Sequence, residues 1–230
     1  MKIFALSDLH LAPNEEKSMD IFGERWKGHF EKIKKDWNEK VSGEDAVLVP
    51  GDFSWAMTIS EAQQNIDDFC ALPGKKIIIK GNHDYWWGSL TKVKTAFYGE
   101  VYPLQNDSVV IGDYVFCGSR GWILPTDKNF SQNDRKIYER EKIRLKLSLD
   151  NAKRADKPII VMMHYPPVYP TQKDTEFAQI ISEYDVRQVV FGHIHGLNEG
   201  NADFTDIDVN GINYNLVSCD YLDFKVKRIL

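Results

Sequence analysis

Five short apolar runs, each ended by polar residues, constrain the fold of this chain more than any other feature. The runs are continuous and rich in β-branched residues, which is typical of strands that are buried on both faces of a sheet. They cover residues 2–10, 45–52, 76–84, 157–167 and 187–196. Helical patterns separate them, and this alternation predicts an α/β fold.

The helical patterns are recognised by their periodicity and by their first residues. An apolar residue recurs every three or four positions through 20–41, and Ser60 and Gln63 form a capping-box pattern that predicts a helix to about Leu72. Further helices are expected over 88–97, 132–154 and 175–184.

Antiparallel pairs are expected as well. Asn210 and Gly211 stand at the centre of an alternating stretch and predict a type I′ hairpin. The segments before and within 114–120 predict a second pair. We therefore expect two mixed sheets packed face to face, flanked by helices, in a single domain over residues 1–230.

Composition excludes some classes of protein. A net charge of −5 and a pI near 5.7 argue against a duplex nucleic-acid binder, which normally carries a basic face. The cysteines, Cys70, Cys117 and Cys219, are widely spaced and predict reduced thiols. We find neither a signal-peptide pattern nor a membrane-spanning run, so we expect a cytoplasmic protein that does not bind membranes.

The polar residues at the five strand ends are the candidate functional residues. They are Asp8 and His10; Asp52; Asn82, His83 and Asp84; His164; and His193 and His195. Ligand sites of α/β sheets form at the carboxyl ends of strands, so these residues can converge although they are far apart in sequence. Imidazole and carboxylate without thiolate suit transition metals, and seven candidate ligands suit two ions that share one carboxylate. Glycines before Asp52, Asn82 and His193 permit the backbone angles that would turn these side chains into the site.

The motifs D-x-H, G-D, G-N-H-D, a lone His and G-H-x-H occur in this order from Asp8 to His195. The chain thereby resembles the calcineurin-like metallophosphoesterase superfamily, whose fold is a sandwich of two mixed sheets flanked by helices. The resemblance implies one metal held by Asp8, His10, Asp52 and His195. It implies a second metal held by Asp52, Asn82, His164 and His193, with Asp52 bridging the two.

The same resemblance implies a reaction. A hydroxide bridging the two ions would attack the phosphorus of a phosphomonoester or phosphodiester in line. His83 would face the substrate phosphate, and Asp84 would orient His83. The ions could be Mn, Fe, Zn, Co or Ni, and the substrate would be a small phosphorylated molecule, with a nucleotide as one option. The stretch GDFSWAM departs from the G-D-x-x-D-R-G of protein phosphatases, which weakens that assignment.

Several residues keep two interpretations. Taken singly, Asp84 could be a helix cap and His164 a core histidine. Trp55, Tyr85, Trp86 and Trp87 either pack beneath the loops or form a stacking platform. Arg120 either binds a substrate phosphate or pairs with a surface carboxylate.

Other parts of the chain bear on the site less directly. We expect His29 to lie on the surface or in packing, and the loop over 121–134 could form a flap. The substrate, the native metals and the oligomeric state are not determined by the sequence.

Rival functions are also open. A scaffold on the same fold that does not catalyse is the alternative from another class, although scaffolds usually lack some of the ligands present here. Zinc hydrolases of other folds fit poorly, because the amidohydrolase H-x-H lies on the first strand and the metallo-β-lactamase motif H-x-H-x-D-H does not match Gly196 and the residues after it.

Overall fold

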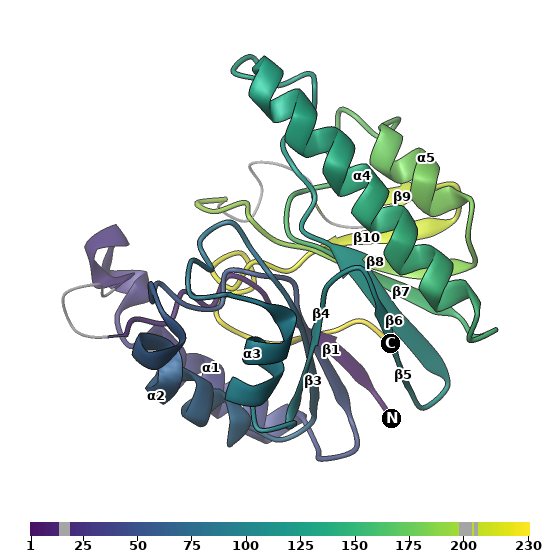
Figure 1. Ribbon diagram of the computed structural model, residues 1–230. Helices are drawn as coiled ribbons and strands as arrows, with labels where there is room; N and C mark the ends of the chain where they lie inside the picture. Colours follow the sequence, from purple (N-terminus) through teal and green to yellow (C-terminus); the bar gives the residue numbers. More distant parts are fainter. Residues whose placement is uncertain (14–18, 198–203, 205–206) are drawn as a thin grey trace.

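The computed structural model describes residues 1–13, 19–197, 204 and 207–230. Within these residues the strands form two mixed sheets (Figure 1). The first sheet, in the order β11-β1-β2-β3-β4, contains β1 (Ile3–Ala5), β2 (Ala46–Val49), β3 (Lys75–Ile79), β4 (Val101–Leu104) and β11 (Lys227–Arg228). The second, in the order β5-β6-β7-β8-β10-β9, contains β5 (Ser108–Ile111), β6 (Tyr114–Ser119), β7 (Ile159–Met163), β8 (Val186–Phe191), β9 (Ile207–Val209) and β10 (Ile212–Leu216).

Helices cover the outer face of each sheet, so the described part has four layers. The helices α1 (His29–Lys40), α2 (Ile59–Cys70) and α3 (Leu90–Ala96) lie on the first sheet, and α4 (Gln132–Lys153) and α5 (Glu176–Ser182) lie on the second (Figure 1). The inner layer is apolar, with Ile3 and Leu48 of the first sheet in one cluster with Phe116 and Met162 of the second. This arrangement confirms the predicted α/β sandwich.

Parallel pairing places the strand ends together. The neighbours β1, β2, β3 and β4 are parallel to one another, as are β6, β7, β8 and β10. Antiparallel strands β11, β5 and β9 lie at the outer edges. The β9–β10 turn has Asn210 at φ 56° and Gly211 at φ 79°, which confirms the type I′ hairpin.

The predicted helix over 20–41 is wrong in its first half. Residues Met19–Phe22 and Glu24–Trp26 form two short 3₁₀ turns, and α1 begins only at His29. Gly23 at φ 117° and Gly28 at φ 60° interrupt the helix in the left-handed region. Phe22, expected on the buried stripe, is therefore 60% exposed.

The start of α2 also differs from its prediction. Its N-cap is Thr58 rather than Ser60, and the Thr58 hydroxyl accepts the backbone N–H of Glu61. Glu61 Oε2 in turn accepts the N–H of Met57 at 2.9 Å. The helix over 132–154 is confirmed as α4, where Ser131 and Asp134 form a capping box.

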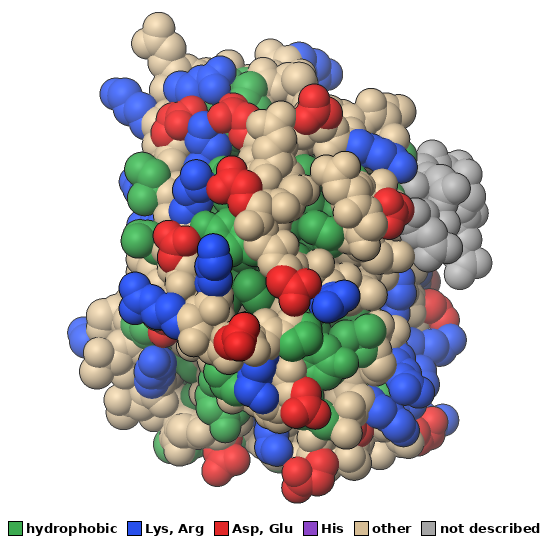
Figure 2. Space-filling view, turned by 90° about the vertical axis from the view of Figure 1, so that its right-hand side faces the viewer, with side chains coloured by type: hydrophobic (Ala, Val, Ile, Leu, Met, Phe, Trp, Pro, Cys, Tyr) green, Lys and Arg blue, Asp and Glu red, His purple; other side chains and the backbone are tan. Residues whose placement is uncertain are grey.

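His29 was expected on the surface or in packing, and it lies in packing. It is buried, and its ring nitrogens lie 2.8 Å from the carbonyl oxygen of Leu9 and 3.2 Å from that of Trp26. Cys70, Cys117 and Cys219 are free thiols. None of the helices in the described ranges has the length and apolar character needed to cross a membrane. On the face shown in Figure 2, Lys and Arg side chains are interspersed with Asp and Glu.

Candidate metal centre

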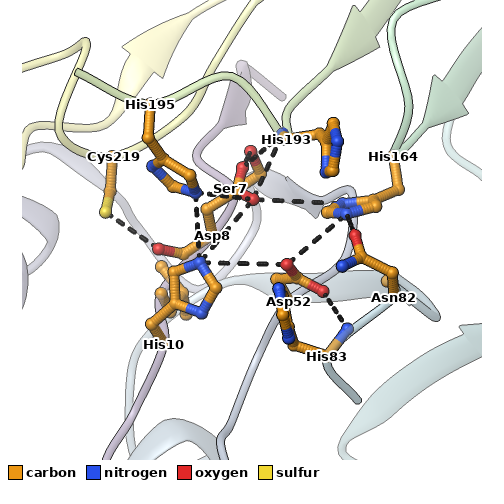
Figure 3. A network of polar contacts seen from close by, with 12 residues as sticks. Ser7, Asp8, His10, Asp52, Asn82, His83, His164, His193, His195 and Cys219 are labelled. Atoms are coloured by element: carbon orange, nitrogen blue, oxygen red, sulfur yellow. Dashed lines mark hydrogen bonds and ion pairs between the residues drawn. The ribbon is translucent and has the colours of Figure 1, made fainter. Parts of the chain in front are cut away.

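The predicted strand-end residues meet where the carboxyl ends of the strands of both sheets come together. Asp8 and His10 follow β1, Asp52 follows β2, Asn82 and His83 follow β3, His164 follows β7, and His193 and His195 follow β8. Figure 3 shows their side chains pointing toward one another from these elements. The two sheets therefore contribute jointly to one cluster.

Two groups of side chains are tight enough to hold a metal ion. One consists of Asp8, His10 and His195, and the other of Asp8, Asp52 and His164, each with ligand atoms within 4.8 Å of one another. Ligand atoms that bind one ion at about 2.0–2.2 Å lie roughly 3–4 Å apart, which is the spacing found here.

Distances within the cluster agree with this spacing. The Nε2 atoms of His10 and His195 are 3.1 Å apart, and His195 Nε2 lies 3.5 Å from Asp8 Oδ1. His164 Nε2 lies 3.4 Å from Asp52 Oδ2, and His10 Nε2 lies 3.8 Å from the same oxygen. Asp8 is the carboxylate that belongs to both tight groups, and Asp52 lies within 3.8 Å of His10 and His164.

Asn82 and His193 lie at the side of His164. Asn82 Oδ1 is 2.6 Å from His164 Nε2. The His193 ring lies 5.1 Å from the His164 ring and 4.1 Å from the Tyr165 ring, between centroids. Its backbone N–H donates to both carboxylate oxygens of Asp8, at 3.1 and 3.0 Å. Among the described residues, neither tight group includes the His193 ring, which lies beside His164 at the cavity.

Two imidazoles make hydrogen bonds through Nδ1, on the side away from the cluster, so that their Nε2 atoms face it. His195 Nδ1 donates to Asp220 Oδ1 at 2.9 Å, and His164 Nδ1 donates to the carbonyl oxygen of Pro50 at 3.0 Å. Such partners fix the tautomer of a metal-binding histidine and raise its basicity. The donor set and its tautomers therefore fit divalent cations.

Asp220 was missed in the sequence. It is buried, and its second oxygen accepts the backbone N–H of Gly196 at 2.9 Å. A signal was present, because Ser218, Cys219 and Asp220 follow an apolar run in the same way as the other candidates. We had interpreted that run only as half of a hairpin, but β10 also pairs in parallel with β8. Its carboxyl end therefore lies at the same edge of the sheet.

Burial and the charges within the cluster shift the pKa values of its residues. Burial raises the pKa of Asp52 well above its usual range, and the nearby Asp8 carboxylate adds to this. Burial lowers the pKa of His164 to about 3 and that of His193 to about 4, so both rings are neutral at pH 7. Although burial opposes it, the hydrogen bonds to Asp220 and Asp8 raise the pKa of His195 to about 10.

The backbone of the ligand loops adopts rare conformations. Asp8, His10, Asp52 and His193 all have positive φ, at 58°, 44°, 52° and 71°. Such values cost of the order of 1–3 kcal/mol each and are concentrated at functional sites. The strain lies mainly on the ligands themselves, whereas we had expected the preceding glycines to adopt these angles.

Gly81 and Gly192 serve a different purpose from the one predicted. A Cβ on Gly81 would lie 2.1 Å from Asp52 Oδ1, and one on Gly192 would lie 2.2 Å from Asp8 Oδ2. These glycines provide space for the Asp52 and Asp8 carboxylates, which belong to neighbouring loops. Only Gly51, at φ 94°, fits the expected role of supplying an unusual angle.

Asp84 does not orient His83, which corrects that prediction. Its carboxylate is fully buried and accepts the backbone N–H groups of Asp52, Phe53, Ser54 and Gly81. It also accepts Trp86 Nε1–H at 2.9 Å. Nor does it cap α3, whose N-cap is Ser89. Asp84 instead joins the loops after β2 and β3, and so positions Asp52.

His83 lines the cavity in front of the cluster. Its backbone N–H donates to Asp52 Oδ1 at 2.8 Å, and its Nδ1 has no hydrogen-bond partner among the described residues. The cavity has a volume of about 500 Å³. It is lined by His10, Met19, Phe22, Arg25, Trp26, Asp52, Trp55, His83, His193, His195, Gly196 and Asp220.

The aromatic residues divide between the two interpretations. Trp86 and Trp87 are buried in packing. Trp55 stacks on His10 at 4.9 Å between ring centroids, lies 4.4 Å from His83 and lines the cavity. Tyr85 is 56% exposed, with its ring 6.2 Å from that of His83. Of this group, Trp55 therefore lines the cavity and Tyr85 lies exposed beside His83.

Arg120 lies apart from this cavity. Its Nη2 atom is 3.5 Å from Glu141 Oε1, and its guanidinium lies over the Trp122 ring at 4.7 Å. The carboxylate interpretation therefore describes its side chain, although Glu141 is buried rather than on the surface. Trp122, in the loop over 121–134, also bonds Asp134 at 3.0 Å. Whether this loop acts as a flap stays a prediction.

Comparisons with known proteins agree with this geometry. The family model described as calcineurin-like phosphoesterase matches residues 1–197. No curated protein matches the chain. A protein of unknown function, AQ665 from Aquifex aeolicus, has a similar crystal structure, with a TM-score of 0.54 and 16% identity over 99% of this chain and 95% of that one. This likeness concerns the fold alone. Because the family model covers most of the chain, including all five motifs, the chain belongs to the calcineurin-like phosphoesterase family.

Proposed function

We propose that this chain is a metal-dependent phosphohydrolase that uses two divalent ions to cleave a phosphoester of a small substrate. The convergence of strand-end carboxylates and imidazoles at the head of one cavity, with His83 beside them, carries the proposal. Membership of the family supports the same reaction class.

The proposed ligands are those that the family motifs imply, and they include every member of the two tight groups. Asp8, His10, Asp52 and His195 would hold one ion, and Asp52, Asn82, His164 and His193 would hold the other, with Asp52 shared. Two such ions supply Lewis acidity, which neutralises phosphate charge and lowers the pKa of bound water. The metals would be transition metals such as Mn, Fe, Co, Ni or Zn, because the donors are imidazole and carboxylate.

His83 is the proposed proton donor or transition-state stabiliser. Its backbone N–H is fixed on Asp52, so the ring is held in the cavity. Burial lowers the pKa of His83 in the free protein. A phosphate dianion beside the ring would raise that pKa again, because an opposite charge favours the imidazolium form. The substrate would thereby create the acid that protonates its own leaving oxygen.

The cavity walls support a substrate with an apolar or flat group. Met19, Phe22, Trp26 and Trp55 form an apolar side beside the ligands, and Arg25 adds a cation. Aromatic walls suit a base or another planar group, which supports a nucleotide-like ester. Both a phosphodiester and a phosphomonoester remain compatible with this wall.

The test is hydrolysis of bis-p-nitrophenyl phosphate and of p-nitrophenyl phosphate by manganese-loaded protein, with a chelated sample as the control. Turnover that the chelator abolishes is the expected result, and the faster substrate identifies diester or monoester chemistry. If the protein binds no metal and hydrolyses neither substrate, the scaffold alternative replaces the proposal.

A further inference from the structure

A second cavity lies beside α4, between the ends of β3, β4 and β6. Its volume is about 220 Å³. Lys80, Trp87 and Arg120 line it from the sheet side, and Arg140, Glu141 and Arg144 line it from α4. None of these residues lines the cavity of the metal centre. The two cavities therefore differ in their walls.

Positive charge is in excess in this cavity. Four cationic side chains line it, and Glu141 is the single carboxylate in its wall. Glu141 Oε1 accepts Arg144 Nη1–H at 2.7 Å and lies 3.5 Å from Arg120 Nη2. Arg140 makes no ion pair with a carboxylate in the described part of the chain.

Two of the four cations in the wall, Lys80 and Arg120, have also lost part of their hydration. The Arg120 side chain is only 20% exposed, and that of Glu141 is 1% exposed. Lys80 Nζ reaches only the carbonyl oxygen of Trp87, at 3.3 Å, among the described residues. A nearby anion would offset this loss of hydration, because it would accept hydrogen bonds from the cations.

Hydrogen bonding at the wall is incomplete. Among buried side-chain atoms of the described residues, Arg120 Nε and Trp87 Nε1 are donors without an acceptor, and Glu141 Oε2 is an acceptor without a donor. Native proteins rarely leave such atoms unpaired, and a bound ion or water is one explanation. Two of the three atoms lack an acceptor, which is what an oxyanion provides.

We propose that this cavity binds a phosphate-sized oxyanion, at a site separate from the metal centre. Guanidinium groups match the geometry of phosphate oxygens and bind them with paired hydrogen bonds. The cavity is smaller than the roughly 300–1,000 Å³ of sites for drug-sized ligands, so the bound group is small. It is either free phosphate or the phosphate group of a larger ester whose remainder stays outside.

The proposed site adjoins the metal centre through the backbone. Lys80 directly precedes Gly81 and Asn82. The carbonyl oxygen of Arg120 accepts the backbone N–H groups of His164 at 3.2 Å and Tyr165 at 2.9 Å. An anion on Lys80 and Arg120 would therefore stabilise the two loops that carry Asn82 and His164.

The experiment must separate this site from the metal centre, which would bind phosphate itself. Binding of inorganic phosphate is measured by calorimetry and by thermal unfolding, on the full chain and on Asp52→Asn in the presence of a chelator. The expected result is saturable binding in both, with no equivalent effect of chloride at the same ionic strength. The affinity for AMP is compared with that for phosphate. Tighter binding of phosphate identifies the free anion as the ligand, and tighter binding of AMP identifies the phosphate group of a larger ester.

Matched variants on α4 locate the site. The Arg140 side chain is exposed, so Arg140→Gln should keep the fold. The double variant Arg140→Gln, Arg144→Gln should weaken phosphate binding about tenfold or more. Arg135→Gln lies on the same helix, pairs with Glu139 outside the cavity and should bind as the parent does. If Arg144→Gln does not fold, Arg140→Gln alone still tests the site.

Two results would overturn the inference. One is no phosphate binding to Asp52→Asn under chelation, and the other is equal binding by Arg140→Gln and Arg135→Gln. Neither result depends on turnover, so a failure here is distinct from a failure of the proposed phosphohydrolase activity.

Discussion

At the scale of single residues, His83 lines the cavity and belongs to neither tight ligand group. We expect His83→Ala to keep the metal and lower kcat by roughly 10²–10⁴-fold, the usual contribution of a positioned acid or base. Steady-state kinetics together with the metal content of the purified variant measure both effects. Tyr102→Phe, at an exposed residue of β4 that lines neither cavity, is the control. An unchanged kcat, or loss of the metal, would show that the proposed role is wrong.

Asp220 is a positioning residue, because it acts on the metal centre through His195. Asp220→Asn keeps the shape of the side chain but can no longer accept both the His195 and the Gly196 N–H groups. Loss of such a partner typically costs about 10–100-fold in metal affinity, and we expect that range here. Competition with a chelator of known affinity measures it.

The matched control for Asp220 lies in the same segment. Asp223→Asn alters a carboxylate that pairs only with Lys225 among the described contacts and has φ 51°, which Asn tolerates. Its metal affinity should equal that of the parent. Equal losses in the two variants would mean that His195 does not depend on Asp220.

At the scale of elements, the loops after β2 and β3 are packed so closely that a methyl group would disturb a ligand. Gly81→Ala places a Cβ 2.1 Å from Asp52 Oδ1, so the carboxylate or its loop must move. We expect loss of most metal binding, measured by metal content after dialysis. Gly43→Ala, where nothing lies within 4 Å of the new Cβ, is the control and should bind metal normally. Normal metal content in Gly81→Ala would show that Asp52 is not an essential ligand.

The same loops show which features of the fold and the site can be predicted from the sequence. The continuous apolar runs correctly predicted β1, β2, β3, β7 and β8. Because the predicted strands are parallel within each sheet, their carboxyl ends lie together, and this explains why Asp8 and His195 meet. Asp84 was misjudged because its partners are backbone N–H groups of another loop, which a residue pattern does not reveal. The helix over 20–41 failed because tertiary packing used Gly23 and Gly28 as breaks inside an apolar period. Arg120 and Glu141 are separated in sequence, and only the docking of α4 on β6 brings them together.

At the scale of the whole molecule, the metal centre joins the two sheets. Asp8 and Asp52 follow strands of the first sheet, and His164 and His195 follow strands of the second. Cys219, beyond β10, also donates its thiol to the carbonyl oxygen of Asp8 at 2.9 Å. Residues from across the chain form the ligand set, so an unfolded chain would not present it. Metal binding should consequently stabilise the fold as a whole.

This linkage yields a measurable shift. At a free metal concentration of about 100 times Kd, a ligand specific for the folded state adds roughly 2.7 kcal/mol to the free energy of unfolding. In a chain of this size, 1 kcal/mol corresponds to about 2–4 °C, so Tm should rise by roughly 5–10 °C over the chelated protein. Asp52→Asn removes the shared carboxylate and should show little rise at the same metal concentration. If both proteins gained equally, the stabilising metal would be bound elsewhere, and the carboxyl ends of the strands would not be the site that links the two sheets.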